Sequence, residues 1–123
     1  MIIFYPYNDH NGKRLENAIA TIIRRQPVVV VHELGILLEY LKQPNSEHRV
    51  LLFQAGSKEQ LQQLGRKSAL PTNLKKILIL PDQSSSVMQA ACQLYPTYMT
   101  HVLGDYKDIL DILVKLKSRF STL

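Results

Sequence analysis

Short apolar runs alternate with amphipathic stretches along the chain. The runs show little polar alternation, as in strands buried on both faces of a parallel sheet. In the stretches between them, apolar residues recur three and four positions apart, which indicates helices packed against a core. We expect strands at residues 2–5, 28–31, 50–53, 77–80 and 98–103. We expect helices at residues 13–25, 35–42, 57–69, 84–95 and 105–120.

Local signals divide these elements. Residues 8–12 are rich in turn-forming side chains, and Pro27 should end the first helix. Ser57 followed three residues later by Gln60 predicts a capping box at the start of the third helix. Serines at 84–86 and the carboxylate of Asp105 suit the first turns of the last two helices, so each helix has a predicted beginning.

Alternating strands and helices predict an α/β fold, because each helix returns the chain to the same edge of a parallel sheet. Five units indicate a flavodoxin-like three-layer sandwich with a five-stranded parallel sheet of order 2-1-3-4-5. The length of 123 residues and the apolar content of 46% suit a single domain, residues 1–123, with one packed core.

No apolar run approaches the roughly 20 residues of a membrane-spanning helix, so no membrane contact is expected. The opening Met-Ile-Ile-Phe-Tyr run has no basic leader and is interpreted as a strand, not a secretion signal. We therefore expect a cytoplasmic protein.

Candidate chemistry lies where the predicted strands end. Parallel sheets bind ligands in the crevice outside the carboxyl ends of their strands. Polar or loop-forming residues follow three of the strands there, and they are Asn8, Asp9, Gln54, Pro81 and Asp82. If this chain binds a small ligand or catalyses a reaction, we expect it to use this crevice.

The order and spacing of the units resemble the receiver domain of response regulators over nearly the whole chain. The sequence Val-Val-Val-Val-His-Glu-Leu-Gly-Ile-Leu-Leu-Glu-Tyr-Leu at 28–41 is similar to the second strand, glycine turn and helix of receivers. The resemblance implies a two-component signalling context. It also implies where the phosphorylation residues should stand: an acidic pair after strand one, an acceptor Asp after strand three, a hydroxyl after strand four and a lysine after strand five.

This chain departs from that set at every position. The corresponding residues are Tyr7 and Asn8 for the acidic pair, Gln54 for the acceptor, Pro81 for the hydroxyl, and Val102 or Leu103 for the lysine. An amide is not a usable nucleophile toward phosphorus, and a lone carboxylate such as Asp9 or Asp82 is a poor Mg²⁺ site. The chain thus looks like a non-catalytic pseudo-receiver that signals by protein–protein interaction without phosphorylation.

In receivers, the face of helix four, strand five and helix five commonly meets partners. Its counterpart here carries the candidate partner surface Gln89, Gln93, Tyr95, Tyr98 and Tyr106. Tyrosines are favourable interface anchors, and the expected partner is another protein or a second copy of the chain. An equally open interpretation is that Tyr95 and Tyr98 pack the end of helix four.

The remaining chemistry is sparse. The net charge of +5 comes from scattered basic residues, so nucleic-acid binding is not expected. The four histidines have no zinc-ligand spacing, and Cys92, the only cysteine, is expected to be a partly buried helix residue, so no metal is expected. Glycine-rich nucleotide motifs are absent, and the loop after strand one lacks the Ser/Thr-rich phosphate cradle of flavin binders, so we expect no cofactor.

Overall fold

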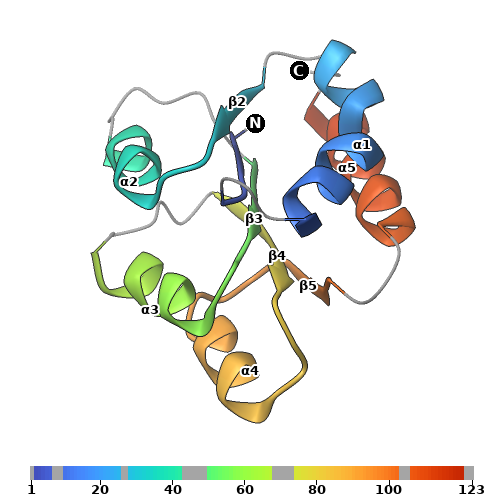
Figure 1. The fold of residues 1–123 in the computed structure, drawn as a ribbon. Helices are drawn as coiled ribbons and strands as arrows, with labels where there is room; N and C mark the ends of the chain where they lie inside the picture. Colours follow the sequence, from blue (N-terminus) through green and yellow to red (C-terminus); the bar gives the residue numbers. More distant parts are fainter. Residues whose placement is uncertain are drawn as a thin grey trace.

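A computed structural model describes most of the chain and contains five strands and five helices in those parts (Figure 1). It describes residues 2–6, 10–25, 28–42, 50–67, 74–102 and 106–120. The strands are β1 (Ile2–Phe4), β2 (Val29–Val31), β3 (Val50–Gln54), β4 (Lys75–Leu80) and β5 (Tyr98–His101). The helices are α1 (His10–Arg25), α2 (Leu34–Lys42), α3 (Lys58–Lys67), α4 (Ser85–Cys92) and α5 (Lys107–Phe120).

The strands form one parallel sheet in the order β2-β1-β3-β4-β5, which confirms the predicted flavodoxin-like arrangement. Every residue of β1 and β3 is buried, whereas most residues of the edge strands β2 and β5 are half-buried. The register pairs Phe4 of β1 with Phe53 of β3, and their rings stack at 4.5 Å between centroids. Continuous apolar runs therefore form the middle of the sheet, as their lack of polar alternation predicts.

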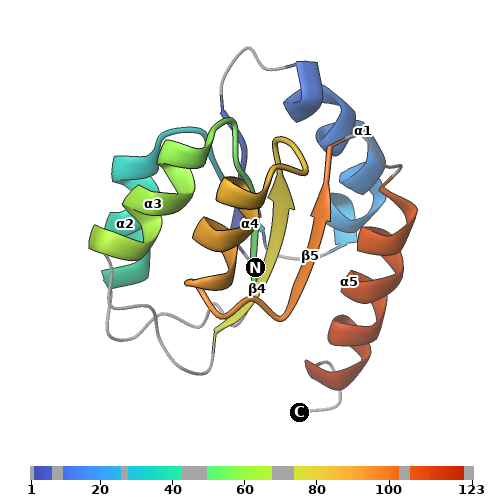
Figure 2. The same ribbon diagram turned by 90° about the horizontal axis from the view of Figure 1, so that it is seen from below.

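Helices cover both faces of the sheet (Figure 2). One layer contains α2, α3 and α4, and the other contains α1 and α5. Because side chains alternate along each strand, Leu78 and Leu80 of β4 pack into the first layer and Ile77 and Ile79 into the second. The result is a three-layer sandwich with two separate apolar clusters.

One boundary error concerns α1, which begins at His10 and not at Lys13. The prediction treated Gly12 as a turn residue, but Gly12 lies inside the first turn of the helix. A Cβ at this position would stand 2.9 Å from Cδ2 of Tyr5 and 3.3 Å from the carbonyl oxygen of Pro6. Glycine is therefore present because the helix start approaches the end of β1 closely.

The predicted helix starts at α3 and α4 are largely confirmed. At α3, the side chain of Gln60 accepts a hydrogen bond from the backbone N–H of Gly56 at 2.7 Å, one residue before the predicted partner Ser57. At α4, the Ser84 side chain accepts a bond from Val87 N, as expected of a serine cap.

Within the described residues, no helix has the length and apolar character needed to cross a bilayer.

Candidate functional site

Gln54 occupies the end of β3, at the carboxyl edge of the sheet where the sequence places the candidate crevice. Its side chain is 0% exposed. The hydroxyl of Tyr106 donates a hydrogen bond to Oε1 of Gln54 at 2.8 Å. Among the described residues, nothing accepts a bond from Nε2 of Gln54. The amide is therefore buried, and its carbonyl oxygen already has a partner inside the protein.

Arg14 of α1 holds the other side of Tyr106. Its Nη1 donates a hydrogen bond to the carbonyl oxygen of Val102 at 2.8 Å, just beyond β5. Its guanidinium carbon lies 5.2 Å from the centroid of the Tyr106 ring, within the range of a cation–π interaction. Arg14, Tyr106 and Gln54 thus form a connected set, which we call the Gln54–Tyr106 latch, linking α1, the segment before α5, and β3.

The structure contradicts the prediction for Tyr106. Tyr106 was expected on the partner surface, but it is only 5% exposed and belongs to the apolar cluster between the sheet and the layer of α1 and α5. The reason is the buried amide of Gln54, which offers the phenol a hydrogen-bond acceptor in the core. Tyr106 is therefore a core residue and cannot anchor a partner.

The residues after β4 form the turn that leads into α4. Pro81 is half-buried, and exposed Asp82 accepts a hydrogen bond from Ser84 N at 2.8 Å. Hydrogen bonds from the side chain and backbone of Ser84 hold the pKa of Asp82 below its ordinary value. Asp82 thus shapes the turn that leads into α4. Asn8 and Asp9, the other residues assigned to the crevice, lie outside the described residues.

A pair of side chains beside this turn has no local signal in the sequence. Nε2 of Gln83 lies 2.6 Å from Nε2 of His101, the last residue of β5. Nδ1 of His101 is buried and has no partner within the described part of the chain. The pair joins the turn after β4 to the end of β5, and only the folded sheet brings these two positions together.

Metal binding finds no support in the described ranges, where no three His, Cys, Asp or Glu side chains gather closely enough to bind an ion. His32 places Nδ1 3.0 Å from the carbonyl oxygen of Tyr5 and packs edge-on against its ring. The side chain of His10 lies outside the described residues.

The other members of the predicted partner surface differ in exposure. Gln89 and Gln93 are exposed on or just after α4, and Tyr95, beyond the helix end, is 85% exposed. Tyr95 therefore does not pack the end of the helix. Tyr98 of β5 is half-buried and packs against the apolar cluster between the sheet and the layer of α1 and α5. Burial first, then the charge and hydrogen bond of Asp108, raise the pKa of its phenol.

Two further side chains add to the exposed side of α4. Met88 is an exposed apolar residue one turn before Cys92, which is exposed and not partly buried as expected. Helix α4 is short and buries only Val87, Ala90 and Ala91, so its other side chains are exposed. The exposed side of α4 therefore combines Met88 and Cys92 with the glutamines.

No protein-family model matches the chain, and no curated protein or solved structure shows significant similarity to it. The candidate sites are therefore interpreted from their own geometry.

Proposed function

We propose that this chain is a receiver-like module that acts without phosphorylation by binding another protein or a second copy of itself. One observation carries the proposal: the position corresponding to the phosphoryl acceptor of receivers is Gln54, a buried amide whose oxygen is bonded to Tyr106. In a receiver, the phosphoryl acceptor is a nucleophilic carboxylate that an incoming phosphate can reach. Gln54 meets neither requirement.

The neighbouring groups support the same conclusion. Asp82 is the described carboxylate after β4, and it accepts its hydrogen bond from the adjacent turn. A magnesium ion is usually bound through one or two carboxylates together with substrate phosphates. Lone Asp82 on an exposed turn offers little toward such a site. The proposal therefore assigns no enzymatic activity and no cofactor.

The exposed side of α4 is the proposed contact surface. It presents Met88 and Gln89 on the helix, Gln93 at the helix end, and Tyr95 just beyond. Methionine and tyrosine are enriched in protein interfaces because each buries a large area on binding. The exposed thiol of Cys92 suits a reducing compartment, so the proposal places the module in the cytoplasm.

The first experiment titrates the protein with beryllofluoride and Mg²⁺ and follows backbone amide chemical shifts by NMR. We expect no saturable shift at residues around Gln54. The control is a phosphorylatable receiver in the same buffer, which should bind. Saturable binding at the carboxyl edge of the sheet would refute the proposal.

The second experiment identifies the partner by affinity capture and then measures its binding to purified variants. Met88→Asp places a charge on the exposed side of α4 and should weaken binding about tenfold or more. Ile36→Asp makes the same change at an exposed site on α2 and serves as the matched control. Equal binding by wild type and both variants would show that α4 is not the contact surface. Sedimentation of the purified chain tests self-association.

A second candidate function is small-ligand binding at the carboxyl edge. It is favoured by Nε2 of Gln54, a buried donor without an acceptor in the described residues, which a ligand oxygen could satisfy. A melting-temperature screen against small carboxylates and phosphates tests it. A concentration-dependent rise that Gln54→Leu abolishes would favour this function.

A further inference from the structure

The stretch of sequence that contains α4 and β5 carries no formal charge. Residues 83–104 include no Asp, Glu, Lys or Arg, although these four types make up 20% of the chain. Every described residue from 83 to 97 with an exposed side chain is therefore uncharged. Charged residues are common on solvated surfaces, whereas the centre of a protein interface is depleted of them. The composition of this exposed stretch is thus typical of a contact surface.

Helix α4 gathers several of these uncharged side chains on one side. Positions three and four apart lie on the same side of a helix, so Met88 and Gln89 both neighbour Cys92. All three are exposed, and exposed Ser85 and Gln93 extend the same side toward the two ends of the helix. The opposite side of α4 is buried in the apolar cluster beneath its layer. Cys92 therefore lies near the middle of the exposed side of α4.

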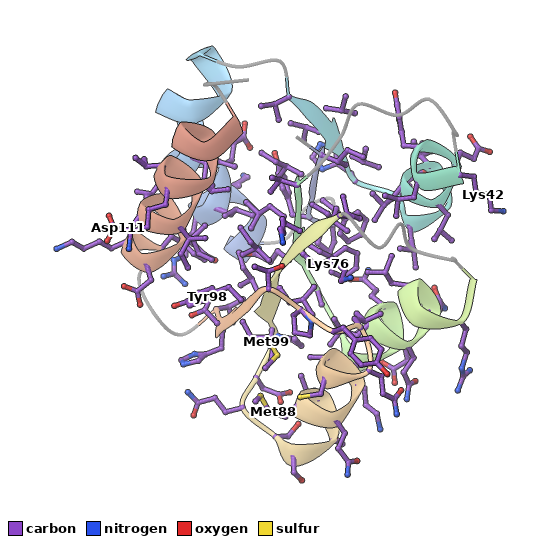
Figure 3. All side chains as sticks on the ribbon, turned by 180° about the vertical axis from the view of Figure 1, so that it is seen from behind. Lys42, Lys76, Met88, Tyr98, Met99 and Asp111 are labelled. Atoms are coloured by element: carbon purple, nitrogen blue, oxygen red, sulfur yellow. The ribbon has the colours of Figure 1, made fainter. Side chains whose placement is uncertain are left out.

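Large apolar side chains are also concentrated here. Figure 3 labels Met88 on α4 near Met99 of the edge strand β5. Met99 packs against the apolar cluster beneath the helix, whereas Met88 is exposed. Tyr95, just beyond α4, is 85% exposed and has a positive φ of 51°, a conformation that glycine or asparagine usually takes after a helix. Among the described residues, the other exposed large apolar side chains, Ile36 and Val114, lie singly on α2 and α5.

The exposed side of α4 is compatible with an identical surface. In a two-fold symmetric dimer the same patch lies on both partners, so a charge on the patch faces its own like charge. A net charge of +5 opposes self-association, and an uncharged surface is where two copies repel each other least. A glutamine amide both donates and accepts hydrogen bonds, so Gln89 and Gln93 can pair with the glutamines of a second copy. A different protein is usually recognised with the help of complementary charges, which this surface lacks.

We propose that the exposed side of α4 is a self-association surface, where a second copy of this chain binds across a two-fold axis that passes close to Cys92. This inference rests on the proposed function and chooses the second copy over a different protein. Helix α4 has eight residues and is about 12 Å long. A contact of this size forms weak, reversible dimers, so dimerisation should follow the protein concentration.

Sedimentation velocity measures the association of the full chain at concentrations up to about 1 mM. We expect the weight-average mass to rise with concentration from that of one chain toward that of two. A mass that stays at one chain over the whole range would overturn the inference.

Charge variants at Gln89 test the symmetry of the contact. Gln89→Glu and Gln89→Lys keep a long exposed side chain and give each copy one charge. At about 0.1 M salt the Debye length is about 10 Å, similar to the length of α4, so like charges repel across the axis. Each variant alone should dimerise about three- to fivefold more weakly than wild type, and an equal mixture of the two should regain the wild-type affinity.

The matched controls are Asn17→Asp and Asn17→Lys. They introduce the same charges at an exposed site on α1, in the opposite helix layer. Each control should change dimerisation by less than about twofold. Rescue in the mixture of Gln89 variants requires that one copy contacts another through α4, because a different partner would carry neither substitution.

Crosslinking gives an independent test at Cys92. Because Cys92 is the only cysteine, a short bis-maleimide that reacts with two thiols must join two chains. The control is the double variant Cys92→Ser, Val114→Cys, which moves the thiol to a 59% exposed site on α5. We expect the wild-type chain to crosslink at least about tenfold faster than this control, because dimerisation raises the effective concentration of the second thiol.

Two further outcomes would overturn the inference: a mixture of Gln89 variants that dimerises no better than either variant alone, or equal crosslinking rates for the wild type and the control. A parallel beryllofluoride titration separates the two proposals. A chain that stays monomeric and gives no beryllofluoride response would reject self-association and leave a module that binds a different protein. A saturable beryllofluoride response would reject the proposed function whatever the oligomeric state.

Discussion

Tyr106→Phe tests whether the Gln54–Tyr106 latch stabilises the fold. The substitution keeps the buried ring and its contact with Arg14, and removes the hydroxyl that donates to Oε1 of Gln54 at 2.8 Å. Oε1 then loses this partner at a side chain that is 0% exposed. Leaving one buried polar group without its partner costs about 1–3 kcal/mol, so we expect the free energy of unfolding to fall by about 2 kcal/mol. For a domain of this size the melting temperature should fall by about 6–10 °C.

The partner variant separates the bond from its surroundings. Gln54→Leu removes the acceptor together with the unpartnered Nε2, and the double variant with Tyr106→Phe leaves two apolar groups facing each other. Replacing both members of a buried pair is less costly than removing one. The double variant should therefore be more stable than the sum of the two single effects predicts, by about 1 kcal/mol or more.

Urea unfolding followed by circular dichroism measures each free energy. The matched control is Tyr95→Phe, which removes a hydroxyl from a ring that is 85% exposed and should change stability by less than about 0.5 kcal/mol. Equal stability of wild type and Tyr106→Phe, or additive effects in the double variant, would show that the hydrogen bond does not hold the latch together.

Two further predictions concern a close approach and a phenol. Gly12→Ala should destabilise the protein by about 1 kcal/mol, because its Cβ would stand 2.9 Å from Cδ2 of Tyr5. Gly35→Ala, where the added Cβ meets nothing within 4 Å, should stabilise α2 by about 0.5–1 kcal/mol; thermal melts in which both variants shift the same way would contradict this. In ultraviolet titrations, the phenol of Tyr98 should ionise above its ordinary pKa of 10.0, and Asp108→Asn should lower that pKa. Because the folded pKa of Tyr98 is raised, its contribution to stability is complete below pH 10.0 and is lost as the pH rises through the folded pKa. An unchanged Tyr98 titration in Asp108→Asn would reject the contribution of Asp108 to the raised pKa.

The fold was predictable because its signals are local. Uninterrupted apolar runs mark the central strands, and helical spacing marks the segments between them, so element order and strand order follow from the sequence. The boundary errors arise where a tertiary contact replaces a local preference. Gly12 lies in a helix because the neighbouring strand end is close, and α4 ends at Cys92, so that Tyr95 takes a left-handed conformation beyond it.

The site was less predictable because its contacts join distant residues. The sequence places Gln54 correctly at the end of β3, but its partner Tyr106 lies 52 positions later and carries no local sign of being buried. The same limit applies to Gln83 and His101, which are 18 positions apart. Pairings of this kind depend on strand register and on the direction of each side chain, and neither follows from periodicity alone.

The two ends of the sheet differ in a way that favours contact surfaces over chemistry. At the carboxyl edge, Gln54 and Asp82 have hydrogen-bond partners within the protein, and both bonds stabilise the fold. At the opposite end, Tyr95 is strained and exposed, and Lys76 bears a charge that burial disfavours. Features that lower the stability of the isolated chain are expected at sites where contacts with a partner offset their energetic cost. The contrast between the two ends is thus a physical reason to test for a partner beside Tyr95.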